Sequence, residues 1–222
     1  MSHAGEAACA WCPHLLVSPR RISQTRRLDP PLQPGRVYRT KEFGAWAKNP
    51  FALATRLVAE GKLRHLGHGL YHCPERSRFG LRPPDEHELV GAFVGRRPFV
   101  FSGTNAWNAL ALGTTQVSMV PLVYNEHRSG LLVLNGRRYQ FKRTRFPVHP
   151  GAEWFAVDFL NNLDEIVDAD PERNLRALRR RLHLDFDRER FAEALAEYGS
   201  RRAKLLVREH RLLDEAEQPH AA

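Results

Sequence analysis

A helix that runs directly into a glycine-rich hairpin constrains this chain more than any other stretch of its sequence. Asn49 stands where a capping side chain is favoured, and Pro50 occupies the first helical turn, where its missing N–H is not needed. Gly61 ends the helix. The next segment, GKLRHLGHGLYHCP (residues 61–74), alternates apolar and polar side chains around two glycines that suit a tight turn. Together these residues predict a helix packed against a two-stranded hairpin.

A shorter helix is predicted immediately before this pair of elements. Residues 40–48 (TKEFGAWAK) place Thr40 at the N-cap and Phe43 on the buried side, although Gly44 weakens the helix. Two helices joined by a tight turn and followed by a hairpin form a winged helix-turn-helix, whose second helix enters the major groove of DNA. We therefore predict a winged helix-turn-helix over residues 19–76.

The positive charge of the chain is concentrated in the same region. The formal net charge of the whole chain is +9. Residues 36–82 hold ten Lys and Arg against three Glu, whereas residues 83–222 hold twenty basic and twenty acidic residues. A local basic surplus is typical of a surface that binds a polyanion, because contacts with phosphates dominate the affinity of proteins for nucleic acids.

The hairpin supplies cationic and imidazole side chains for such a surface. We predict phosphate or minor-groove contacts from Lys62, Arg64, His65, His68 and His72. For the histidines, a hydrogen-bonding role within the hairpin remains an open alternative. The polar face of the preceding helix carries small residues and a single arginine, Arg56, which suits close approach to another surface.

The N-terminal segment is less informative. Residues 1–18 lack sustained periodicity and are predicted to be a disordered extension, and residues 18–28 predict a short helix. Cys9 and Cys12 form one C-x-x-C, but a zinc site normally needs a second pair of ligands, so free thiols are favoured. We expect neither a signal peptide nor a membrane span, and hence a cytoplasmic protein.

Residues 85–222 predict a second domain of the α+β class, with a mixed or antiparallel sheet and C-terminal helices, after a linker over residues 77–84. Strands are expected at residues 98–103, 117–126, 130–134 and 137–146, and helices at residues 85–94, 104–113, 152–167, 170–182 and 185–216. Asn135-Gly136, between the last two strands, is a strong signal for a two-residue hairpin turn. Either Asp185 or Asp187 is expected to open the last helix.

Motifs of enzyme chemistry are scarce in the sequence. It contains no G-x-S-x-G, Walker loop, H-E-x-x-H or paired C-x-x-C, and we predict a non-enzyme with no catalytic residue, metal or cofactor. The acidic residues Asp85, Glu86 and Glu88 fit the first turn of a helix, where the helix dipole favours negative charge. Two alternatives stay open: a divergent metal-dependent nuclease that uses Glu88, Glu126 and Asp158, and a protein-binding adaptor.

Two stretches of the chain resemble a known family. Residues 35–74 are similar to the N-terminal winged-helix module of antitoxins from AbiE-type, type IV toxin–antitoxin systems, and Gly69-Leu70-Tyr71 is the centre of the shared wing motif. Downstream, FVFSGTNAWNALALGTTQVSMVPLVYNE (residues 99–126) resembles the start of the antitoxin domain, and RRYQFKRTR (residues 137–145) resembles the strand that follows it. The resemblance covers roughly residues 35–168.

This resemblance implies two activities. The winged helix would bind inverted repeats in double-stranded promoter DNA and repress its own gene. The second domain would counteract a nucleotidyltransferase toxin without forming a stable complex with it. Carried over by position, the implied DNA contacts are Thr40, Lys41, Asn49, Thr55, Arg56, Arg64 and His68.

Overall fold

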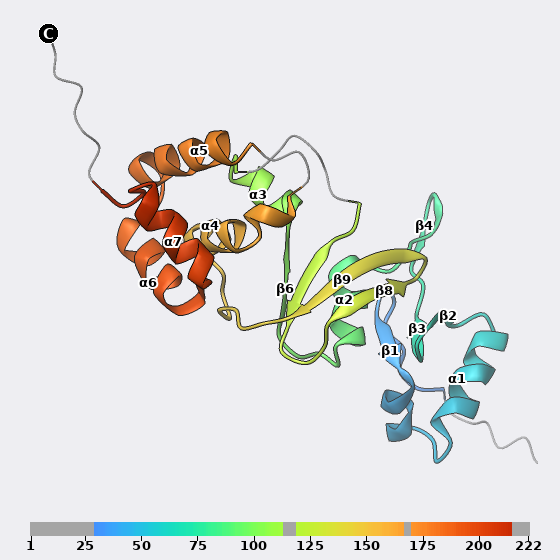
Figure 1. Ribbon diagram of the computed structural model, residues 1–222. Helices are drawn as coiled ribbons and strands as arrows, with labels where there is room; N and C mark the ends of the chain where they lie inside the picture. Colours follow the sequence, from blue (N-terminus) through green and yellow to red (C-terminus); the bar gives the residue numbers. More distant parts are fainter. Residues whose placement is uncertain (1–28, 113–118, 167–169, 215–222) are drawn as a thin grey trace, which may run out of the picture. The chain divides into compact units, whose positions relative to one another are not determined.

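The computed structural model of the 222-residue chain describes residues 29–112, 119–166 and 170–214 (Figure 1). The helix expected at residues 18–28, the extension over residues 1–18 and the pair Cys9 and Cys12 lie outside the described residues. Within the described ranges the chain combines helices with three sheets, which confirms the α+β class. By its internal contacts the chain from Leu32 onward forms one unit.

The N-terminal part of this unit combines two short helical segments with a small antiparallel sheet. Its elements are β1 (Val37–Arg39), the 3-10 helix η1 (Thr40–Ala45), α1 (Pro50–Ala59), β2 (Arg64–Gly67) and β3 (Leu70–His72). The strand order β1-β3-β2 makes β3 the central strand. The predicted cap of α1 is confirmed, since Asn49 Oδ1 accepts a hydrogen bond from the Ala52 N–H at 3.0 Å.

The prediction that Thr40 caps the first helix is wrong. The N-cap position falls on Arg39, whose N–H donates to the Glu42 carboxylate at 2.9 Å. The Thr40 hydroxyl instead donates to the Gly69 carbonyl in the β2–β3 turn, at 3.2 Å. The segment is a tighter 3-10 helix of six residues, which ends at Ala45 rather than at residue 48 as the sequence predicts.

The turn between β2 and β3 lies where the sequence predicts it. Gly67, His68 and Gly69 all have positive φ, at 91°, 51° and 68°. This conformation strains side chains with a Cβ, so the two glycines allow the chain to reverse within three residues while His68 bears the strain.

A second hairpin follows directly, formed by β4 (Arg76–Ser77) and β5 (Gly80–Leu81). It occupies most of the segment that the sequence predicts as a linker, residues 77–84. The next element is α2 (Glu86–Phe93), which Asp85 caps by accepting the Glu88 N–H at 3.0 Å. The acidic start of this helix is therefore explained by capping and by the helix dipole.

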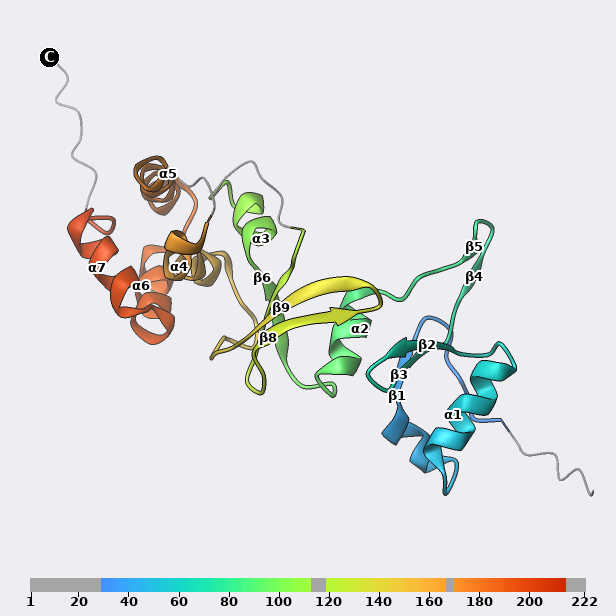
Figure 2. The ribbon, with the colours of Figure 1, turned by 45° about the vertical axis from the view of Figure 1, so that its right-hand side comes forward.

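The largest sheet is mixed and has the order β6-β7-β9-β8. Its strands are β6 (Phe99–Ser102), β7 (Leu122–Asn125), β8 (Gly130–Leu134) and β9 (Arg137–Arg143). The pairing of β7 with β9 is parallel and the other two pairings are antiparallel. Asn135 and Gly136 have φ of 47° and 79°, the conformation of a type I′ turn, so the predicted β8–β9 hairpin is confirmed (Figure 2).

Helices make up the C-terminal part. They are α4 (Ala152–Asn161), the short η2 (Leu163–Glu165), α5 (Pro171–Leu184), α6 (Arg188–Tyr198) and α7 (Arg201–Glu209), joined by α3 (Thr104–Ala109) from the middle of the chain. Their apolar faces share one core, in which Phe159, Leu178 and Phe191 are fully buried. No helix among the described residues is long and apolar enough to cross a membrane.

The single helix expected at residues 185–216 is wrong, because the chain breaks into α6 and α7. A Cβ on Gly199 would overlap the Leu195 carbonyl oxygen, so the last turn of α6 closes against a residue without a side chain. Ser200 then caps α7 by accepting the Ala203 N–H at 3.1 Å. Of the two aspartates considered for opening α6, Asp187 takes that role.

Candidate nucleic-acid interface

The predicted DNA contacts come from four neighbouring pieces of the N-terminal part: η1, the start and outer face of α1, the α1–β2 connection, and the β2–β3 hairpin. Exposed side chains among them are Lys41, Asn49, Thr55, Lys62, Arg64, His65 and His68, and half-buried ones are Thr40 and Arg56. Leu57 and Ala54 on the opposite face of α1 are fully buried against the hairpin residue Tyr71. Burial of this face therefore turns the polar face of α1 outward.

Glu60 joins two of the predicted cations. Its carboxylate lies 2.7 Å from Arg56 Nη1 and 2.8 Å from Lys62 Nζ. The hydrogen bonds from Lys62 and then from Arg56 lower the pKa of Glu60 below its ordinary value. A phosphate that binds at this point has to compete with the Glu60 carboxylate for both cations. Ion pairs this exposed are weak, so the exchange costs little free energy.

Two polar residues of α1 have part of their hydrogen-bonding capacity occupied within the helix. Asn49 uses Oδ1 for the cap, and the Thr55 hydroxyl donates to the Phe51 carbonyl at 2.9 Å. The amide N–H groups of Asn49 and the hydroxyl oxygen of Thr55 can still bond a nucleic acid. Thr55 is therefore left with a hydrogen-bond acceptor and Asn49 with donors.

Thr40 holds the hairpin in place. Its N–H donates to the Gly69 carbonyl at 2.9 Å, in addition to the bond from its hydroxyl. A Cβ on Gly69 would lie 2.9 Å from the Thr40 hydroxyl oxygen, so the contact also depends on glycine in the turn. The geometry gives Thr40 a positioning role in η1.

The three hairpin histidines have different surroundings. His72 is 1% exposed on the central strand, and burial, followed by the nearby Arg64 charge, lowers its pKa. The predicted phosphate contact from His72 is therefore wrong. His65 is exposed and its ring stacks on Tyr71 at 5.0 Å.

His68, at the tip of the β2–β3 hairpin, contacts the rest of the unit. Its Nε2 lies 3.1 Å from the Val133 carbonyl of β8, and its ring meets Phe93 of α2 edge-on at 5.8 Å. The tip of the hairpin is thus fixed by a side chain that the sequence assigns to DNA. As a whole, His68 is still exposed to solvent.

Charged side chains also tie β1 to α2. Glu88 Oε1 accepts bonds from the Val37 N–H and from Arg96 Nη2, both at 2.9 Å, and Arg96 Nη2 donates to the Val37 carbonyl at 2.8 Å. Burial disfavours the charge of Glu88, but the bonds from Arg96 and Val37 hold its pKa below the ordinary value. Beneath them Val37 and Leu70 share an apolar cluster with Phe93 and Phe141.

The carboxylates considered for a nuclease do not form a metal site in the described part of the chain. Glu88 is committed to Arg96, Glu126 is exposed after β7, and Asp158 is buried on α4. Within residues 29–112, 119–166 and 170–214, no group of three His, Cys, Asp or Glu side chains could hold a metal ion.

A buried polar cluster, which the sequence analysis did not predict, surrounds Asp158. Its carboxylate accepts hydrogen bonds from Ser102 Oγ, from Trp107 Nε1 at 2.9 Å and from Tyr124 OH at 2.6 Å. Asn162 adds a bond to Oδ1 at 3.0 Å. These residues, with Lys142 Nζ 2.8 Å from Asn162 Oδ1, form what we call the Asp158 cluster.

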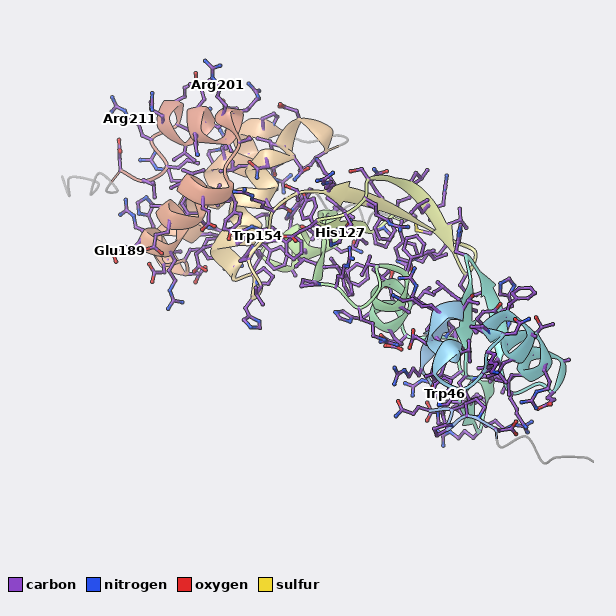
Figure 3. The ribbon with its side chains drawn as sticks, turned by 90° about the horizontal axis from the view of Figure 1, so that it is seen from below. Trp46, His127, Trp154, Glu189, Arg201 and Arg211 are labelled. Atoms are coloured by element: carbon purple, nitrogen blue, oxygen red, sulfur yellow. The ribbon has the colours of Figure 1, made fainter. Side chains whose placement is uncertain are left out.

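The Asp158 cluster connects β6, β7, β9, α3 and α4. Burial raises the pKa of Asp158, against the pull of its hydrogen-bond donors. Trp154, labelled in Figure 3, packs edge-on against Tyr124 of the cluster at 6.0 Å.

The sequence contains a signal for this cluster, since Asp158 interrupts the apolar run WFAVDFL. Full satisfaction of the carboxylate gives the cluster a structural role.

No protein-family model matches this chain, and no curated protein matches it. The function therefore has to be argued from the residues of the site.

Proposed function

We propose that this protein is a cytoplasmic, sequence-specific DNA-binding regulator whose N-terminal part is a winged helix-turn-helix. In this proposal α1 is the recognition helix in the major groove, and the β2–β3 hairpin is the wing along the phosphate backbone. The observation that carries the proposal is the arrangement of η1, α1 and the hairpin, with the cationic side chains on the outer surface.

The electrostatics support the same proposal. The surplus of seven positive charges over residues 36–82 belongs to this part of the chain. Lys41 of η1, Lys62 of the α1–β2 connection and Arg64 of β2 are all exposed. In the proposed complex these cations, on elements that precede and follow α1 in the chain, would supply the phosphate contacts that position the helix on the duplex.

The antitoxin activity is the second half of the proposal and rests on the resemblance alone. We propose that the protein represses its own promoter at inverted repeats and that the part from α2 onward counteracts a nucleotidyltransferase toxin without a stable complex.

Fluorescence anisotropy tests the proposed DNA binding, by titration of a duplex from the region upstream of the protein's own gene (the upstream duplex). We expect tighter binding to this duplex than to a shuffled duplex of the same composition, with an affinity that falls steeply as salt rises. Equal affinity for the two duplexes at moderate salt contradicts the proposal. Cleavage of the duplex when Mg²⁺ is added favours the nuclease instead.

A further inference from the structure

The β4–β5 hairpin presents an aromatic ring to solvent at its tip. Phe79 is 85% exposed, and Leu81 on the returning strand is 51% exposed. In Figures 1 and 2 the hairpin projects from the chain between β3 and α2. Single apolar side chains on a surface are common, but a phenylalanine held outward at a turn keeps a large apolar ring in water, so burial of this ring against a partner would be favourable.

One arginine contacts this ring, and a second lies on the preceding strand. The guanidinium of Arg78 stacks over the Phe79 ring at 4.6 Å, and Arg76 precedes it on β4. Residues 75–82 contain one acidic residue, Glu75, and its carboxylate pairs with Arg82 at 3.3 Å. The tip is therefore both apolar and cationic, which fits a polyanion that also offers flat apolar surfaces.

The turn itself is held by side-chain bonds. Ser77 Oγ donates to the Gly80 carbonyl at 3.0 Å and accepts the Phe79 N–H at 3.2 Å. These bonds fix the backbone at Phe79, so the ring is presented at little further cost in conformational entropy.

We propose that the tip of the β4–β5 hairpin is a second DNA contact, in which Phe79 enters the minor groove and packs between base pairs while Arg76 and Arg78 contact phosphates. This inference rests on the proposed function, because it needs the duplex that α1 binds. Apolar wedges with flanking arginines are a common means of minor-groove binding. Residues 75–78, at about 3.3 Å per residue, span roughly 13 Å, enough to reach the floor of a groove about 7.5 Å deep.

The neighbouring elements favour the minor groove. Three residues, Cys73 to Glu75, separate β3 from β4. This short connection ties the β4–β5 hairpin to the wing, which in the proposed mode lies along the backbone that borders a minor groove, where A·T-rich steps are narrow and attract arginine.

The experiment uses full-length protein and the upstream duplex with 2-aminopurine at successive positions. We expect wild-type protein to increase the fluorescence of 2-aminopurine at one or two steps, because an inserted ring unstacks the base. Phe79→Ala should abolish the increase and weaken binding about tenfold. Leu184→Ala, which removes an exposed apolar side chain from α5, is the matched control and should change neither quantity.

Arg78→Gln should weaken binding and reduce its salt dependence, whereas Arg180→Gln on α5, with the same loss of charge, should not. Unchanged fluorescence in the wild type, or wild-type affinity in Phe79→Ala, overturns the inference while leaving the proposed function intact. Tighter Phe79-dependent binding to the single strands than to the duplex also overturns it. Failure of wild-type protein to distinguish the upstream duplex from the shuffled one defeats the proposed function itself.

Discussion

Two groups of polar side chains lie in opposite surroundings in this protein. Around α1 and the β2–β3 hairpin most of the predicted DNA contacts are exposed, and Glu60 shares its carboxylate between two cations. In the Asp158 cluster, by contrast, a carboxylate that is 3% exposed accepts bonds from four side chains. The exposed cations around Glu60 can exchange its carboxylate for a ligand at little cost. The residues of the Asp158 cluster cannot exchange their hydrogen-bond partners unless the surrounding core opens.

The largest effect is expected from the buried group. Asp158→Ala leaves Ser102, Trp107 and Tyr124 with buried donors and no acceptor, so we expect a loss of about 3 kcal/mol or more in the free energy of unfolding. Urea denaturation followed by circular dichroism measures this loss. Asp164→Ala, which breaks the exposed pair with Arg202, should cost less than about 1 kcal/mol. Equal costs for the two variants would remove the distinction between the regions.

The next largest effect is on DNA binding. If Arg56 reads a base edge from α1, Arg56→Ala should weaken binding to the upstream duplex by about 1–3 kcal/mol and relax its sequence preference. Its effect on the free energy of unfolding should be small, since the pair with Glu60 is half-exposed. Arg180→Ala on α5 is the control. A loss of stability with unchanged DNA affinity would show that Arg56 acts within the helix.

The stability contributions of half-buried Glu88 and buried Asp158 should depend on pH in opposite directions. The lowered pKa of Glu88 means that its contribution to stability is present above the unfolded-state pKa and is lost as pH falls through the folded-state pKa. The raised pKa of Asp158 has the opposite effect. The folded state binds a proton more tightly than the unfolded state, so stability falls as pH rises from the unfolded-state pKa to the folded-state pKa of Asp158.

Glu88→Gln should therefore cost about 1–2 kcal/mol at neutral pH and progressively less below about pH 4.5. The Asp158→Asn variant should instead approach or exceed wild-type stability as pH rises. Urea denaturation at several pH values, compared with wild type, gives both differences. The prediction fails if the two differences change in the same direction with pH.

The smallest effect is expected from the exposed carboxylate of Glu60. Glu60→Gln removes the carboxylate that competes with phosphate for Arg56 and Lys62, so DNA affinity should rise, by at most about fivefold. Glu193→Gln on α6 changes the net charge equally and should have a much smaller effect. Anisotropy titrations at two salt concentrations measure both, and lower affinity of Glu60→Gln would mean that Glu60 orients the two cations for binding.

The features that were predictable from the sequence are local. The Asn49 cap and the Asn135-Gly136 turn each depend on residues within a few positions of one another, so short motifs reveal them. The burial of His72 was missed because alternation cannot show that β3 lies between β1 and β2. The Asp158 cluster was missed because its donors lie up to 56 residues away in sequence.

The shared core beneath β1 and β3 determines how this protein can be divided. Val37 and Leu70 are fully buried against side chains of α2 and β9, and Glu88 bonds the backbone of β1 from outside that sheet. A fragment that ends at residue 76 would expose these apolar faces to water and would lack a partner for the Val37 N–H. The elements proposed to bind DNA therefore depend on α2 and β9 for their fold, and we do not expect them to fold as a separate domain when they are moved into another protein.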